Sequence, residues 1–303
     1  MSRSIHAPAL LALGCLALGC LALSGCMAQE AQSDKAEPVN TERQLLFAEE
    51  FNAPALDRTK WNVVGPEFWV NREQQAYVDD PRTIQFAENI EGADGGALVL
   101  RPVYAPGEDT LAERDAPFIS GRINSRDKFD FAFGRAEARI RMPDAQGVWP
   151  AFWLLGNGQW PQTGEIDIME YVGEKDWTGV AVHGTGYSGD AGLDNRFFFE
   201  DGTDATDWHV YAVEWTRNSM EFEIDGRLTF RVTRPMTQFF GGWHFDNPKF
   251  LILNFAMGGV YPAKTSGIED PYYGIPQATV DMVRDGKGDV AMYVDWVRVY
   301  APQ

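Results

Sequence analysis

Cysteine is scarce in this sequence, and the part that would form a folded domain has none. The 303 residues include only Cys15, Cys20 and Cys26. The remaining chain therefore has no thiol for a disulfide bond or a cysteine zinc site. Histidine is also rare, with four residues, and no H-E-x-x-H spacing occurs, so we expect no required cofactor and no catalytic metal.

Positive charge is the second shortage. Lys and Arg number 26 against 44 Asp and Glu, which gives a net charge of -18. The resulting negative field opposes binding to nucleic acid, anionic lipid surfaces and sulfated polysaccharides. We expect a monomer that acts on a neutral partner.

Residues 1–26 are typical of a targeting segment. Arg3 supplies a positive start, residues 8–23 are apolar, and Leu-Ser-Gly-Cys at 23–26 resembles a bacterial lipobox. The resemblance implies that Cys26 is acylated and becomes the mature N-terminus. A plain signal peptide cut near Ala28 and an uncleaved anchor remain open alternatives.

Residues 27–43 are polar and lack hydrophobic periodicity, which predicts a tether. The tether would join the lipid to a single catalytic domain over residues 44–303. Because Met27 rather than Asp follows the cysteine, we expect export to the outer membrane or cell surface, with the lipid as the only membrane contact.

Alternation of apolar and polar residues dominates the domain and predicts strands. Residues 134–142 and 292–300 are clear examples, and Asp225-Gly226 predicts a hairpin turn. No amphipathic segment of about 12 residues appears, and 30 glycines and 17 prolines interrupt the strands. These features favour an all-β fold, a two-sheet sandwich of jelly-roll type.

Three acids fall within six residues, at Glu165, Asp167 and Glu170. On a helix the two glutamates would lie roughly 140° apart, so they could not act on one bond. On a strand Glu165 and Asp167 share a face, and Glu170 joins them only if Ile168 or Met169 is the extra residue of a β-bulge. A merely solvated acidic face explains the run poorly, because like charges on one strand face are destabilising.

Paired carboxylates are typical of glycoside hydrolysis. A separation of about 5 to 5.5 Å gives retention and a wider one inversion, and neighbouring positions on one strand favour retention. Glu165 would be the nucleophile and Glu170 the general acid/base. Asp167 would hydrogen-bond to Glu165 and leave it ionised while Glu170 keeps a proton.

The run Gly-Glu-Ile-Asp-Ile-Met-Glu at 164–170 resembles the signature of glycoside hydrolase family 16, in its bulged Glu-x-Asp-x-x-Glu branch. Its wording is close to the laminarinase, or endo-1,3-β-glucanase, version. Further stretches resemble the family at 50–52, 134–153, 183–189, 211–215, 253–254 and 294–296. The resemblance implies a jelly roll with a concave substrate cleft and endo-acting hydrolysis of β-1,3-glucan.

Aromatic residues precede the acids, and indole faces suit the apolar faces of glucose. The resemblance places Trp153 and Trp160 in the cleft, whereas Trp149 fits cleft or core equally well. It also implies that His183, in a glycine-rich loop after the acids, lies near the acid/base. Some relatives carry a second histidine where this chain has Gly179.

Four more residues have weaker signals. Asn71 and Arg122 are candidates for binding sugar hydroxyls, although either could be an ordinary surface residue. Family members often carry a structural calcium, and Glu50 and Asp295 match its side-chain positions. Two distant acids do not by themselves identify a calcium site, so calcium stays open.

Two other functions remain in competition. Agarases, porphyranases and κ-carrageenases share the bulged motif, and mixed-linkage β-glucan is a further substrate, but the negative charge argues against sulfated polymers. A non-catalytic glucan-binding lipoprotein is the alternative from another class. The retained set of three acids favours the enzyme.

Overall fold

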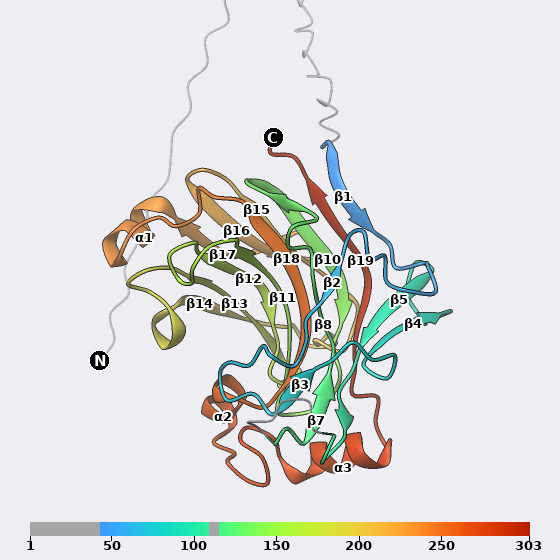
Figure 1. Ribbon diagram of the computed structural model, residues 1–303. Helices are drawn as coiled ribbons and strands as arrows, with labels where there is room; N and C mark the ends of the chain where they lie inside the picture. Colours follow the sequence, from blue (N-terminus) through green and yellow to red (C-terminus); the bar gives the residue numbers. More distant parts are fainter. Residues whose placement is uncertain (1–42, 109–114) are drawn as a thin grey trace, which may run out of the picture. The chain divides into compact units, whose positions relative to one another are not determined.

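Two antiparallel sheets form the framework of the computed structural model, which describes residues 43–108 and 115–303 (Figure 1). The predicted two-sheet, all-β architecture is confirmed. The alternation in residues 134–142 forms a strand with alternate side chains buried, and residues 292–300 form the last strand. Asp225-Gly226 makes the predicted turn between two paired strands.

The first sheet has the order β17-β16-β15-β10-β19-β5-β4, with β1 also paired to β19. Its strands, in chain order, are β1 Leu45–Glu49, β4 Ile84–Glu88, β5 Gly96–Leu100, β10 Gly134–Arg141, β15 His209–Trp215, β16 Ser219–Ile224, β17 Arg227–Thr233 and β19 Met292–Tyr300.

The second sheet has the order β14-β13-β12-β11-β18-β8-β2, with β9 also paired to β18. Its strands are β2 Asn62–Val63, β8 Arg122–Asn124, β9 Asp130–Phe131, β11 Val148–Gly156, β12 Glu165–Glu170, β13 Trp177–His183, β14 Leu193–Phe198 and β18 Lys249–Met257. The three acids lie on β12, so this sheet positions the site.

Smaller elements surround the sheets. A three-stranded sheet pairs β3 Gln75–Tyr77, β7 Phe118–Ser120 and β6 Val103–Tyr104. The helices are short: a 3-10 turn at Gly189–Ala191, α1 Arg234–Phe240, α2 Val260–Ser266 and α3 Gln277–Asp285. None of the helices in the described residues has the length and apolar character needed to span a membrane.

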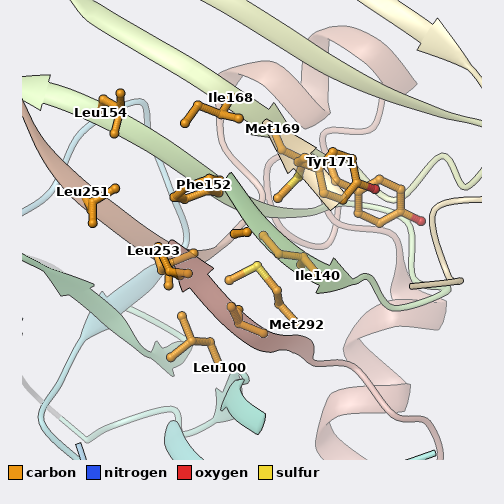
Figure 2. Close-up of a cluster of buried hydrophobic side chains, with 14 of the residues drawn as sticks. Leu100, Ile140, Phe152, Leu154, Ile168, Met169, Tyr171, Leu251, Leu253 and Met292 are labelled. Atoms are coloured by element: carbon orange, nitrogen blue, oxygen red, sulfur yellow. The ribbon is translucent and has the colours of Figure 1, made fainter. Parts of the chain in front are cut away.

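The main core fills the space between the sheets, where apolar side chains from both meet (Figure 2). One sheet contributes Phe152, Leu154, Ile168, Met169, Leu251 and Leu253, and the other contributes Leu100, Ile140 and Met292. Because side chains alternate along a strand, these inward residues leave their neighbours on β11, β12 and β18 to face away from the core.

Candidate active site

A register shift in β12 gathers the three acids. Asp167 pairs with Trp153 and Met169 pairs with Phe152, so Ile168 is the extra residue against β11. Pairing with β13 shifts in the same interval. Ile168 and Met169 are both buried, and Figure 2 shows both side chains within the hydrophobic core. The bulge predicted at Ile168 or Met169 is therefore present, and it returns Glu170 to the face of Glu165 and Asp167.

The acids form one wall of a cavity on the face of the sheet that points away from the core. It is lined by Val70, Asn71, Glu73, Arg122, Trp149, Ala151, Trp153, Glu165, Asp167, Glu170, Asn254 and Ala256. Two of the lining residues, Ala151 and Ala256, have only a methyl side chain. A cavity with aromatic walls, a few polar groups and buried acids has the composition of a sugar-binding active site.

Burial perturbs all three carboxyl groups. It raises the pKa of Glu165 to about 8, and repulsion from Asp167 adds to the rise. Burial likewise raises the pKa of Glu170 to about 7, although a hydrogen bond from Trp149 lowers it in part. The pKa of Asp167 lies well above its usual range, because burial and the charge of Glu170 both disfavour its ionised form. The group therefore holds protons near neutral pH.

The assignment of Glu165 as the ionised group and Glu170 as the protonated one stays a prediction, because both pKa values are raised to near neutrality. For Glu165 burial is the larger cause, and the charge of Asp167 adds to it because two negative charges in a low-dielectric wall are not both stabilised. Asp167 therefore favours the protonated form of Glu165 in two ways, through its charge and through a hydrogen bond.

The three tryptophans have different places. Trp149 is half-buried in the cavity, and its Nε1 donates to Glu170 Oε1 at 2.9 Å, which decides between cleft and core in favour of the cleft. Trp153 also lines the cavity, and its Nε1 donates to Asn254 Oδ1 at 2.7 Å. Trp160 is 46% exposed in the loop between β11 and β12 and hydrogen-bonds to Glu165, so it lies at the rim.

His183 is the last residue of β13, not a loop residue as expected. It pairs in register with Glu165, and its Nε2 lies 3.2 Å from Asp167 Oδ2. Its influence lowers the pKa of Glu170 as well, after the larger effects of burial and Trp149. His183 therefore serves the whole acid group rather than the acid/base alone.

Asn71 and Arg122 both line the cavity, together with residues that sequence reasoning missed. Arg122 is buried, and its guanidinium lies 4.8 Å from the ring centre of Trp153. Glu73 is also buried and accepts a hydrogen bond from Gln75 Nε2 at 2.7 Å. Burial raises the pKa of Glu73, whereas Arg122 and Asn71 lower it. Glu73 is distinguished by its burial near a buried cation, Arg122, and the sequence does not show that these two residues lie close together.

Glu50 and Asp295, the residues matched to a structural calcium, each have an arginine partner, and calcium binding there stays a prediction. Asp295 is buried, forms an ion pair with Arg139, and accepts from the backbone N–H of Asp94. Glu50 accepts two hydrogen bonds from Arg298, at 2.8 and 3.0 Å. Each carboxylate already has a cationic partner, so a hard cation would have to displace arginine from both.

In the described residues one acid and histidine cluster has metal-ligand spacing, formed by Glu165, Asp167 and His183 with ligand atoms within 4.8 Å of one another. It belongs to the active site. The segments 1–26 and 27–43, including Cys26, lie outside the described residues except for Arg43.

Residues 69–283 match Glycosyl hydrolases family 16. A beta-glucanase of Rhodothermus marinus is 34% identical over 277 residues, which cover 86% of this chain and 90% of that protein. A glucan endo-1,3-beta-glucosidase A1 of Niallia circulans is 30% identical over 298 residues, 88% of this chain and 39% of that protein.

The chain is also similar to solved structures of glucanases. The endo-beta-1,3-glucanase of Pyrococcus furiosus has a TM-score of 0.72 at 29% identity, covering 86% of this chain and 94% of that one. The laminarinase catalytic domain of Thermotoga maritima MSB8 has a TM-score of 0.70 at 29% identity, covering 86% and 99%.

Proposed function

Because the chain belongs to glycosyl hydrolases family 16, we propose that it is an endo-acting, retaining β-1,3-glucanase of the laminarinase kind. The observation that carries the proposal is the bulge in β12, which brings three acids to one wall of an aromatic cavity. Glu165 attacks the anomeric carbon and forms a covalent glycosyl-enzyme. Glu170 protonates the leaving oxygen and then deprotonates the incoming water.

The surrounding residues have supporting roles in this proposal. Trp149 holds Glu170 through its N–H, and Glu165 shares a hydrogen bond with Asp167. Trp153, Asn71 and Arg122 contact the sugar on the nucleophile side, and no metal takes part.

The first experiment is a reducing-sugar assay on laminarin, lichenan, agarose and κ-carrageenan. We expect laminarin to be the best substrate and the sulfated polymer to be untouched, with NMR of early laminarin products showing retained configuration. An inverted first product would rule out the covalent mechanism. Tight laminarin binding without cleavage would identify a glucan-binding protein instead.

We also propose that Cys26 is acylated and holds the enzyme at the outer membrane or cell surface, with residues 27–43 as spacer. The support is the lipobox-like wording of 23–26 alone. Cys26→Ala should release or mislocalise the enzyme, whereas Cys20→Ala should not. A wild-type protein that takes up no labelled palmitate in its bacterial host contradicts the proposal.

A further inference from the structure

One row of side chains crosses the active-site sheet at the level of Glu170. Six residues on neighbouring strands are paired in register, namely Arg122, Asn254, Ala151, Glu170, Gly179 and Arg196. Paired residues of antiparallel strands project to the same face. Arg122 and Asn254 therefore lie on one side of Glu170, and Gly179 and Arg196 lie on the other.

Gly179 opens a space that another element fills. A Cβ atom at this position would lie 3.1 Å from the hydroxyl oxygen of Tyr261, a residue of α2. Because Gly179 has no side chain, the hydroxyl of Tyr261 can lie against β13 at Gly179, the residue paired with Glu170. The ring of Tyr261 meets that of Trp149 edge to face, with ring centres 5.5 Å apart.

Arg196 completes this side of the row. Its guanidinium lies 4.1 Å from the ring centre of Trp177, and the ring of Tyr261 is 6.4 Å from the same ring. Burial raises the pKa of Tyr261, the carboxylates of Glu170 and Asp194 raise it further, and a hydrogen bond with Arg196 opposes the rise. Tyr261 is half-buried and Arg196 is exposed, so both can reach a ligand.

The Tyr261 side of the row lies beside the acid/base. The ring of Tyr261 contacts Trp149, whose Nε1 donates to Glu170 Oε1. The opposite end of the row is formed by Arg122, whose guanidinium lies over the ring of Trp153. In a retaining mechanism the nucleophile bonds to the sugar that stays, and the acid/base protonates the oxygen of the sugar that leaves. We propose that Tyr261 and Arg196 form the subsite for the leaving glucosyl unit, with Trp177 as support beneath the guanidinium.

This subsite has the chemistry that a neutral sugar needs. The Tyr261 ring offers an apolar surface, its hydroxyl both donates and accepts, and the guanidinium donates several hydrogen bonds without requiring an anion. The inference rests on the proposed hydrolysis of β-1,3-glucan, and it adds residues that bind the part of the chain beyond the scissile bond.

The test compares two substrates with the same retained sugars, a laminari-oligosaccharide and an aryl laminarioside whose leaving group is 4-nitrophenol. Tyr261→Ala should lower kcat/KM for the oligosaccharide about 10- to 100-fold and leave the aryl substrate within about twofold. Tyr261→Phe should cause a smaller loss of the same selectivity. Arg196→Met, at an exposed position, tests the subsite if Tyr261→Ala does not fold.

Azide separates this role from an indirect one through Glu170. Because aryl substrates also tolerate a misplaced acid, azide is added as a nucleophile that needs no general base; it should accelerate Glu170→Ala and not Tyr261→Ala. The matched control is Tyr293→Phe, which removes a hydroxyl on β19 of the first sheet that donates to Asp289. Equal losses on both substrates, or azide rescue of Tyr261→Ala, overturns the subsite. A wild type that cleaves no laminari-oligosaccharide refutes the proposed function instead.

Discussion

At the scale of single residues, the site places three acidic side chains close together, where they are poorly solvated. Glu165, Asp167 and Glu170 share one face of one strand; Asp167 is buried and the two glutamates are half-buried. The cost of ionising one rises when another is ionised, so their proton affinities are linked. This linkage gives two groups with pKa values near neutrality, the range in which a general acid and a nucleophile can both be supplied.

Glu165, the proposed nucleophile, is the first residue to change. Glu165→Ala should reduce laminarin turnover by about 10⁴-fold or more, because no covalent intermediate can form, while oligosaccharide affinity measured by calorimetry stays within several-fold of wild type. Glu200→Ala, at an exposed acid paired with Arg227, is the control and should keep full activity. Substantial turnover by Glu165→Ala would assign the nucleophile elsewhere.

The pH profile follows from the same pair. The proposed mechanism needs Glu165 ionised and Glu170 protonated, and their pKa values of about 8 and about 7 predict a bell-shaped kcat/KM with its maximum between these values. Both limbs should appear when laminari-oligosaccharide hydrolysis is followed across the pH range. A maximum below about pH 5 would show that Glu165 ionises far more easily than the buried position allows.

Stability should depend on pH through Glu165. Its pKa is raised in the folded protein from 4.5 to about 8, so its contribution to stability is fully present below 4.5 and is lost as the pH rises through 8. Wild type should therefore lose on the order of 3 kcal/mol of unfolding free energy between about pH 5 and 9 relative to Glu165→Gln. Denaturant unfolding of both proteins measures the difference; Lys249, whose pKa burial lowers to about 7, is common to both and cancels. Parallel curves for the two proteins would contradict the linkage.

At the scale of elements, β12 carries two demands that a regular strand cannot meet. Its outer face must present Glu165, Asp167 and Glu170, and its inner face must supply Ile168 and Met169 to the core. The register shift solves both, because one extra residue changes which face the downstream side chains occupy.

Changing the length of β12 tests this arrangement. Deleting Met169 gives Glu-Ile-Asp-Ile-Glu, in which regular alternation keeps all three acids on one face, so some activity should survive the lost core volume. Inserting alanine after Ile168 turns the downstream acid away from the scissile oxygen, and activity should fall to that of Glu170→Ala. Laminarin turnover is compared after circular dichroism shows both variants folded. Equal losses, or survival of the insertion alone, contradict the bulge.

At the scale of the whole molecule, the negative net charge favours neutral polysaccharides over anionic ones. The net charge of -18 disfavours anionic polymers at long range, whereas a neutral glucan feels little of this field. The cavity itself contains acids and only one buried arginine among its lining residues, so it offers no cluster of cations for sulfate groups.

The effect of salt on activity tests this selection by charge. For laminarin, kcat/KM should change less than about twofold between low and high salt, because screening alters only interactions between charges. A sulfated galactan added as a competitor should not inhibit at low salt. Strong inhibition at low salt that disappears at high salt would show that the enzyme attracts anionic chains despite its charge.

The sequence by itself determined the properties that depend on local spacing. Alternation located the strands, Asp225-Gly226 located a hairpin, and the parity of Glu165, Asp167 and Glu170 required a strand with one extra residue. These features follow from the period of the strand, which acts over a few residues.

Only the tertiary structure decided what lies beside the acids. Arg122 and Arg196 come to the two ends of one row because β8 and β14 lie on opposite sides of β12, and α2 brings Tyr261 into the space above Gly179. The pairing of Asp295 with Arg139 likewise appears only after the first sheet forms. Such contacts join residues far apart in the chain, and their energies depend on burial and cross-strand neighbours, which no local pattern encodes.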